Sequence, residues 1–156
     1  MLNPSPKVVW VEDIGLIGIG NTAKEAETIT DIAAQNIRVI SNSEKAGGFH
    51  PVKEKDLFEM EYWSLEQAKI GKSKKLPLQG KVTLVTGGGG TIGASIVKFF
   101  YANGAEVIAV DINQKHLTAQ KFPSGVLTRQ LDVTDEQQID VLINDILLKF
   151  GGIDIL

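Results

Sequence analysis

Cysteine is absent from this sequence of 156 residues, and histidine occurs only twice. Without cysteine there is no disulfide framework and no thiol chemistry, which agrees with a reducing compartment, and we expect the cytoplasm. His50 lies in a loop between glycines and a proline, and no second ligand is spaced to join it there. We therefore predict no metal site, because such sites need several converging ligands.

Long apolar runs and a strong charge of one sign are also lacking. No run approaches the roughly 18 residues of a membrane span, and the first residues lack the apolar core of a signal peptide. The formal net charge is −3, so charge gives no reason to expect nucleic acid or a membrane as a partner. Hydrophobic residues make up 43% and charged residues 22%, as in an ordinary soluble protein of one or two domains.

A stretch of glycines between an apolar strand and a helix is the most informative feature present. The strand is predicted over residues 81–86 and the helix over 91–103, ending at Gly104. Glycines let the backbone turn tightly beside a pyrophosphate, and the helix offers free N–H groups and a positive dipole end. The predicted phosphate-binding residues are Thr86, Gly87, Gly88, Gly89, Gly90, Thr91, Ile92 and Gly93.

Acidic residues end the next two predicted strands. Asp111 comes 18 residues after Gly93, close to the ~20 expected for an acid that binds a ribose. Its carboxylate can accept from both hydroxyls of an adenosine ribose and would repel a 2′-phosphate, so NAD is favoured over NADP. The strand before Asp132 ends where an adenine edge would lie. Ile112, Asp132 and Val133 are therefore predicted, with Asp111, to bind the cofactor.

The second half of the chain alternates strands and helices. Strands are predicted over 106–110 and 126–131, helices over 113–121 and 135–150, the latter capped by Thr134, and a fourth strand from 153. This order implies a parallel sheet with right-handed crossovers. The predicted fold class is α/β, a partial doubly wound, Rossmann-like sheet preceded by a small α+β segment.

The α+β segment is predicted over residues 1–70. Gly15, Gly18 and Gly20 lie inside an apolar run instead of after one, which favours a strand hairpin over a second nucleotide loop. Helices are predicted over 22–41, starting at a Thr22 capping box, and over 56–70. Tyr62 and Trp63 in the second helix are interpreted as packing groups. Residues 71–79, with glycine, serine, proline and three lysines, are the predicted linker.

Residues 80–156 resemble the start of a short-chain dehydrogenase/reductase. The resemblance is carried by residues 80–87, the pair Ile92 and Gly93, Asp111, residues 131–134 and residues 151–156. It implies an NAD-binding enzyme that transfers hydride. The family's commonest loop is T-G-x-x-x-G-x-G, and Thr91 stands at its middle glycine, so the spacing matches the extended branch of the superfamily. The departure bears on the path of the loop and not on phosphate binding.

Residues 1–70 resemble the end of a class II aldolase domain, on residues 15–21, 22–41 and 58–69. In one bifunctional family a domain similar to rhamnulose-1-phosphate aldolases precedes a short-chain dehydrogenase in this order. The likeness implies a sugar-derived alcohol or aldehyde as substrate. The catalytic serine, tyrosine and lysine of the dehydrogenases have no counterpart here, since Lys98 and Tyr101 stand in reversed order. We therefore expect an interior segment of a larger enzyme, without catalytic residues of its own.

Three functions stay open on the sequence. The chain is the NAD(H)-binding segment of an oxidoreductase, a dinucleotide-binding module without catalysis, or part of another Rossmann class, such as a nucleotide-sugar epimerase or an S-adenosylmethionine enzyme. Half of a doubly wound sheet leaves an edge strand and apolar helix faces uncovered. We therefore expect a homo-oligomer, or packing of helices 22–41 and 56–70 on the sheet.

Overall fold

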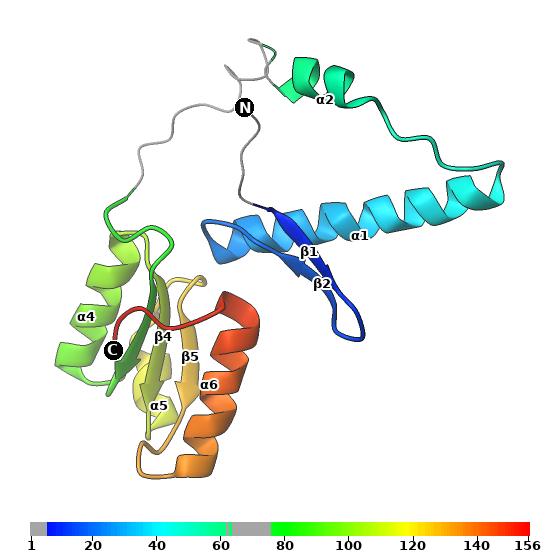
Figure 1. Cartoon of the computed structure of the whole chain (residues 1–156). Coiled ribbons are helices and arrows are strands. Elements are labelled where there is room, and N and C mark those ends of the chain that lie inside the picture. Colours follow the sequence, from blue (N-terminus) through cyan, green and yellow to red (C-terminus); the bar gives the residue numbers. More distant parts are fainter. Residues whose placement is uncertain (1–5, 62, 64–75) are drawn as a thin grey trace. The chain divides into compact units, whose positions relative to one another are not determined.

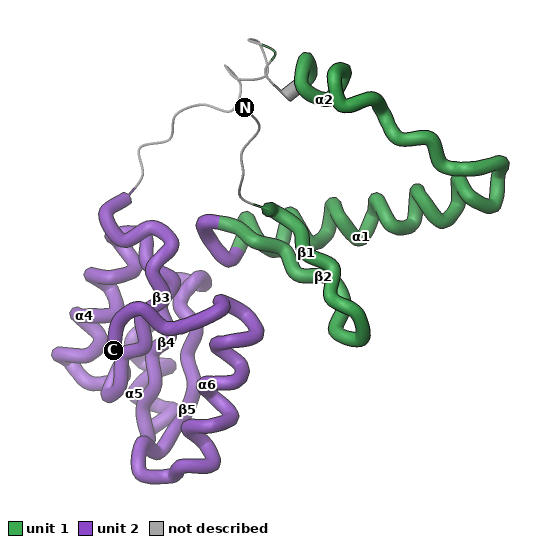
Figure 2. The backbone as a smooth tube through the Cα atoms, in the orientation of Figure 1, with its two compact units in different colours: residues 1–20, 24–74 green, residues 21–23, 75–156 purple. Residues whose placement is uncertain are grey.

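The computed structural model describes residues 6–61, 63 and 76–156 and divides the chain into two compact units (Figures 1 and 2). Unit 1 comprises residues 1–20 and 24–74, and unit 2 comprises residues 21–23 and 75–156. Among the helices of the described residues, none combines the length and the apolar character that a membrane span requires.

Unit 1 begins with an antiparallel hairpin of β1 (Val8–Val11) and β2 (Gly15–Gly18), which confirms the predicted hairpin. Gly18 of β2, and Gly20 just after the hairpin, allow close packing against α1 (Ala23–Lys45). A Cβ at Gly18 would lie 2.2 Å from the Thr30 hydroxyl oxygen, and one at Gly20 would lie 2.4 Å from the Ala26 nitrogen. These glycines allow a strand and a helix to approach closely, so they have a structural reason that needs no nucleotide.

The helices of unit 1 differ in length from the prediction. α1 continues to Lys45, past the predicted end at residue 41, because the next glycines in the sequence, Gly47 and Gly48, both with positive φ, come only after it. α2 (Glu54–Glu61) begins two residues before the predicted start at residue 56, and residues 62 and 64–70 of the predicted helix, Tyr62 among them, lie outside the described residues. Trp63 is 52% exposed, so its interpretation as a packing group is wrong. Leu57, Phe58 and Met60 of α2 are exposed as well, at 52%, 44% and 69%.

Unit 2 is a parallel sheet in which a helix follows each strand along the chain (Figure 1), which confirms the predicted fold class. The strands β3 (Val82–Thr86), β4 (Glu106–Asp111) and β5 (Leu127–Gln130) lie in that order. The helices are α4 (Thr91–Ala102), α5 (Gln114–Ala119) and α6 (Glu136–Phe150). The pairing register sets Val82 opposite Glu106 and Ile108 opposite Leu127.

Helices cover both faces of β4, and β3 and β4 are accordingly mostly buried and apolar, whereas β5 is exposed. On one face, Ile108 and Val110 of β4 pack with Leu142 and Ile146 of α6. On the other face, residues 107 and 109 of the same strand pack in a cluster with helices α4 and α5. Successive side chains of β4 thus enter opposite halves of the core, as the alternation of a strand requires.

The helix ends follow local hydrogen bonding. α4 ends in a Schellman motif, because Gly104 has φ 92° and the N–H of Ala105 donates to the Phe100 carbonyl at 3.1 Å. α6 is capped by Asp135, whose carboxylate accepts from the Gln138 N–H, so the prediction of Thr134 as the cap is wrong. Thr134 instead donates its N–H and its hydroxyl to the carboxylate of Asp132, at 2.9 and 2.7 Å.

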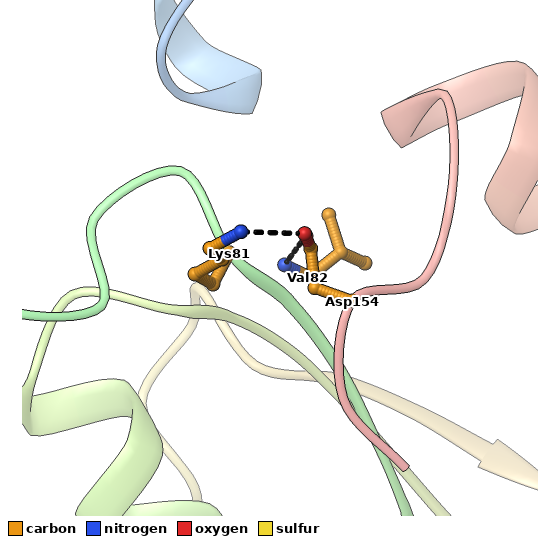
Figure 3. Close-up of polar contacts among 3 residues, drawn as sticks. All are labelled: Lys81, Val82 and Asp154. Atoms are coloured by element: carbon orange, nitrogen blue, oxygen red, sulfur yellow. Dashed lines mark hydrogen bonds and ion pairs between the residues drawn. The ribbon is translucent and has the colours of Figure 1, made fainter.

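The predicted fourth strand is present as a single parallel bridge between Ile155 and Thr83. The N–H of Leu84 donates to the Ile155 carbonyl at 2.9 Å, and Asp154 bonds to Lys81 and Val82 beside it (Figure 3). Since β4 already occupies one edge of β3, Ile155 lies at the other edge. The strand order therefore reverses at β3, and in open α/β sheets ligands bind at such a switch point.

Candidate cofactor-binding site

The glycine loop and Asp111 meet at one edge of the sheet. The loop follows β3 at the switch point, and Asp111 is the last residue of the neighbouring β4. Parallel strands have their carboxyl ends at the same edge of the sheet. Residues of β3 and β4 that are 24 positions apart in the sequence therefore lie side by side. Two of the predicted groups are in direct contact, because the N–H of Gly89 donates to Asp111 Oδ2 at 3.0 Å.

The N–H groups of three consecutive glycines hold the loop in place. The N–H of Gly88 donates to the Val110 carbonyl at 2.8 Å, that of Gly89 to Asp111, and that of Gly90 to the Gly87 carbonyl at 3.0 Å. Each bond is made inside unit 2. These N–H groups therefore shape the loop, and a phosphate has to be bound by others.

The first turn of α4 supplies those other N–H groups. Gly90 is the N-cap and has no side chain to cap the helix, and the first helical bond runs from the Ala94 N–H to the Gly90 carbonyl at 2.8 Å. The N–H groups of Thr91, Ile92 and Gly93 precede that bond and have no acceptor within the helix. No acidic residue lies in this turn. The helix end can therefore receive an anion on its N–H groups and its positive dipole end.

Close approach explains why glycine is needed at some of these positions and not at others. A Cβ at Gly93 would lie 2.2 Å from the Gly87 carbonyl oxygen, and one at Gly88 would lie 2.9 Å from the Ala109 Cβ. Gly87 itself has φ 64°. At Gly90 the nearest atom would be 3.4 Å away, which is ordinary contact. The tight positions are where the loop touches β4 and the start of α4.

Thr91 fits the loop without strain. It is the first residue of α4 and is exposed, and among the described residues other than glycine only Asp13 and Lys121 have positive φ. A side chain at position 91 therefore meets neither a forbidden backbone conformation nor the core. The loop backbone therefore accommodates threonine at the position where the commonest family pattern has glycine.

Asp111 has acceptor capacity left for a sugar. Its Oδ2 accepts the Gly89 N–H at 3.0 Å, and its Oδ1 accepts the Asn113 N–H at 2.9 Å. An ionised carboxylate offers about four lone-pair positions, so about two remain. Two is the number that the hydroxyls of an adenosine ribose would use.

Three exposed apolar side chains follow the ends of the three strands. Ile92, Ile112 and Val133 are 78%, 63% and 54% exposed. They come after β3, β4 and β5 respectively, at the edge that carries the loop. Exposed aliphatic groups beside a polar ribose site suit the faces of an adenine ring, so all three stay candidates for cofactor contacts.

Asp132 has a local partner that the sequence interpretation lacked. The N–H of Thr134, and then its hydroxyl, lower the pKa of Asp132, against a smaller opposing effect of burial. One of its oxygens accepts both bonds, at 2.9 and 2.7 Å. Asp132 is therefore first a turn residue, and a contact to adenine stays a prediction.

Two glutamines were missed by the sequence reasoning. Gln120 Nε2 donates to the Gly89 carbonyl at 2.8 Å, and Gln130 Nε2 donates to the Ile112 carbonyl at 2.9 Å. Both hold backbone of predicted cofactor-binding residues. No spacing rule pointed to them, because each contact joins residues that are far apart in sequence.

Tyr101 lies away from this edge. It is ten residues beyond Thr91 on the same helix, which is roughly 15 Å along the axis. Its ring lies against Gly125, where an added Cβ would be 2.8 Å from the Tyr101 hydroxyl oxygen. This position supports the expectation that Lys98 and Tyr101 are not a catalytic pair.

Comparison with known proteins finds two families along the chain. Residues 1–70 match the family described as aldolase class II, second domain, and residues 81–156 match short chain dehydrogenase. The uncharacterized oxidoreductase YuxG of Bacillus subtilis is 28% identical over 161 residues, which cover 97% of this chain and 23% of YuxG. Both segments thus lie in one relative, in the order found here.

Two dehydrogenases named for different substrates match the second half of the chain with the same sequence identity. (+)-Borneol dehydrogenase 1 of Salvia officinalis and galactitol 2-dehydrogenase of Agrobacterium fabrum are each 41% identical over 81 residues, covering 51% of this chain. The chain spans 31% and 32% of those two proteins. A crystal structure of 3-ketoacyl-(acyl-carrier-protein) reductase from Brucella melitensis with NADH matches at 31% identity and a TM-score of 0.45, over 48% of this chain and 32% of that one. Residues 81–156 therefore belong to the short-chain dehydrogenase family, and residues 1–70, which precede them, belong to the second-domain family of the class II aldolases.

Proposed function

We propose that unit 2 binds NAD(H) at the carboxyl edge of its sheet, as the cofactor segment of an oxidoreductase. The pyrophosphate lies on the first turn of α4, and the adenosine ribose lies on Asp111. The observation that carries the proposal is the 3.0 Å bond from the Gly89 N–H to Asp111, because it puts the ribose acceptor beside the phosphate-binding loop. The free acceptor positions of Asp111 and the open first turn of α4 supply the remaining contacts.

The preference for NAD over NADP follows from charge. The Asp111 carboxylate beside the 2′-hydroxyl would repel a phosphate at that position, and no arginine immediately follows Asp111 in the sequence to offset the repulsion. In unit 2 the guanidinium of Arg129 is paired with Asp145 of α6. Asp111 therefore decides between the two cofactors.

Calorimetric titration of the chain tests this proposal. Both tryptophans lie in the sequence of unit 1, so calorimetry is a better readout than their fluorescence. ADP-ribose should bind within about threefold of NADH, because the described contacts are to the adenosine and pyrophosphate half. A 2′-phosphate on ADP-ribose should weaken binding by about tenfold or more.

Asp111→Ala is the matching variant, and Asp140→Ala, at an exposed position on α6, is its control. Asp111→Ala should weaken the binding of ADP-ribose and remove most of the discrimination against its 2′-phosphate form. Asp140→Ala should change neither the affinity nor the discrimination. If wild-type chain does not bind ADP-ribose at millimolar concentration, unit 2 is not a formed dinucleotide site and the proposal fails.

We propose a sugar-derived alcohol or aldehyde as the substrate class of the whole enzyme. The aldolase match at residues 1–70 and the match to galactitol 2-dehydrogenase support it. The equal identity to (+)-borneol dehydrogenase 1 means that residues 81–156 do not choose the substrate. Because the catalytic serine, tyrosine and lysine of the dehydrogenases have no counterpart in this sequence, the chain should bind ADP-ribose without reducing NAD in the presence of galactitol. Measurable turnover by the purified chain would contradict that expectation.

A nucleotide-sugar epimerase of the extended branch is the second candidate, supported by the spacing of Gly87, Gly90 and Gly93. The support is small, because Gly90 has room for a Cβ, so glycine there is not required by packing. Binding of a UDP-sugar more tightly than ADP-ribose would favour this candidate. A module without catalysis shares the binding prediction and differs only in lacking a hydride-transferring parent.

The expected homo-oligomer also stays a proposal. Ile92, Ile96 and Phe99 form an exposed apolar stripe on α4, and β5 is an exposed strand. Such surfaces favour self-association. Sedimentation velocity should show a dimer or larger species that Phe99→Ser weakens; a monomer at all concentrations would contradict it.

A further inference from the structure

Both backbone polar groups of Gly89 are held by side chains from other parts of unit 2. Its N–H donates to Asp111 Oδ2 at 3.0 Å, and its carbonyl accepts from Gln120 Nε2 at 2.8 Å. Asp111 ends β4, and Gln120 is the C-cap of α5. One glycine of the loop is thus fixed from two directions.

The helix that carries Gln120 is itself anchored. Leu117 of α5 is 1% exposed and packs in the core beside Val97 and Val126. The same helix abuts the loop, because a Cβ at Gly89 would lie 2.7 Å from the His116 Cβ and 3.0 Å from the Leu117 nitrogen. Gln120 therefore projects to Gly89 from a rigid support, which makes its bond an effective restraint.

Such a restraint matters at this position because of the backbone on either side. Four consecutive glycines have the greatest conformational freedom of any sequence. Gly89 directly precedes Gly90, the N-cap of α4, so rotation about Gly89 redirects the first turn of the helix. The same rotation would remove the Gly89 N–H from Asp111. The phosphate-binding and ribose-binding groups therefore depend on one glycine.

We propose that Gln120 is a positioning residue for the dinucleotide. By holding the Gly89 carbonyl, it keeps the Asp111 carboxylate and the first N–H groups of α4 in the relative geometry that adenosine and pyrophosphate need together. This inference rests on the proposed function. It assigns a role in cofactor affinity to a residue outside the glycine motif.

Gln120→Leu removes the hydrogen-bond donor to the Gly89 carbonyl and keeps a side chain of similar size. The control is Gln137→Leu, which makes the same change at an exposed position on α6. Calorimetry with ADP-ribose should show about tenfold weaker binding for the first variant, the effect of one lost hydrogen bond, and wild-type binding for the second. The thermal midpoint of Gln120→Leu measures folding independently. A loss of affinity without a matching loss of folded protein supports the inference.

Gln120→Glu gives a readout that packing alone would not move. An ionised glutamate cannot donate to the Gly89 carbonyl, whereas a protonated one can, and the carbonyl favours the protonated form. Relative to wild type at each pH, the affinity of this variant for ADP-ribose should recover as the pH falls from about 7.5 to about 5, towards the ordinary glutamate pKa of about 4.3. Gln120→Leu should show no such recovery.

Hydrogen exchange of the Gly89 amide, followed by NMR without ligand, measures the restraint directly. Exchange should be slow in wild type and about tenfold faster in Gln120→Leu, while Gln137→Leu matches wild type. Wild-type binding by Gln120→Leu, with no pH effect in Gln120→Glu, would overturn the role of Gln120 and leave the NAD proposal standing. Failure of the wild-type chain to bind ADP-ribose would overturn both.

Discussion

Asp154 joins the last residues of the chain to the start of β3 through Lys81. One carboxylate oxygen lies 2.8 Å from Lys81 Nζ, and the other accepts the Val82 N–H at 2.9 Å (Figure 3). The Lys81 ammonium, and then the Val82 N–H, lower the pKa of Asp154 against the effect of burial. The contact secures the bridge of Ile155 to Thr83 beside it.

Asp154→Asn should lower the thermal midpoint of unit 2 at pH 7, because the amide keeps one acceptor and loses the ion pair. A carboxyl whose pKa is lowered by folding adds stability above its unfolded pKa of about 3.9, and that stability disappears as the pH falls through the folded value. The difference between wild type and variant, measured by circular dichroism, should therefore shrink towards pH 3. An equal difference at pH 7 and pH 3 would show that the charge is not the cause.

Thr83→Val should stabilise the protein. Thr83, the second residue of β3, is 1% exposed, and its hydroxyl is the buried side-chain polar atom without a partner in the part of the chain that the structure describes. Valine has nearly the same shape and no hydroxyl to desolvate, so we expect a gain of about 1 kcal/mol in the free energy of unfolding. Urea unfolding measures it. Thr128→Val, at an exposed position on β5, is the control and should change little; a loss of stability in Thr83→Val would mean that the hydroxyl has a partner in solution.

Gly93→Ala should be far more damaging than Gly90→Ala. The new Cβ at position 93 would lie 2.2 Å from the Gly87 carbonyl oxygen, which is backbone and cannot rotate away. Overpacking of this kind costs about 1–3 kcal/mol. At position 90 the contact is 3.4 Å and φ is −76°, so the cost should stay within about 1 kcal/mol, the range of an N-cap change. Equal effects in urea unfolding would contradict this loop geometry.

Thr91→Gly restores the glycine of the commonest family pattern. Since Thr91 is exposed and begins α4 with ordinary backbone angles, we expect a loss of about 0.5–1 kcal/mol from added backbone freedom. ADP-ribose affinity should change by less than about threefold, because the N–H groups stay in place. A tenfold gain in affinity would show instead that threonine distorts the phosphate site.

Local patterns were enough to predict most of unit 2. Apolar runs buried on both faces, glycines at turns and an acid at the end of β4 are signals that neighbouring residues carry themselves. The cap of α6 was misplaced by one residue for a related reason. Thr134 and Asp135 are both good caps, and the choice depends on Asp132, which takes Thr134 as its own partner.

The remainder depended on contacts that sequence spacing does not encode. Gln120 reaches Gly89 across 31 residues, and only the packing of α5 brings them together. In unit 1, α1 extended past its predicted end because polar residues 42–45 tolerate a helix until glycine ends it. Trp63 was expected to pack because aromatic residues supply buried area, yet its side chain is 52% exposed.

The bridge between Ile155 and Thr83 also has a consequence for the order of folding. Thr83 pairs with Val107, 24 positions away, on one side and with Ile155, 72 positions away, on the other. Closing the longer loop costs about 1 kcal/mol more in chain entropy, so β3, β4 and β5 should associate first and the strand at Ile155 last. The switch point at β3 has a neighbouring strand on each side only after that final step. Maturation of the cofactor site would then coincide with the slowest event in the assembly of the sheet.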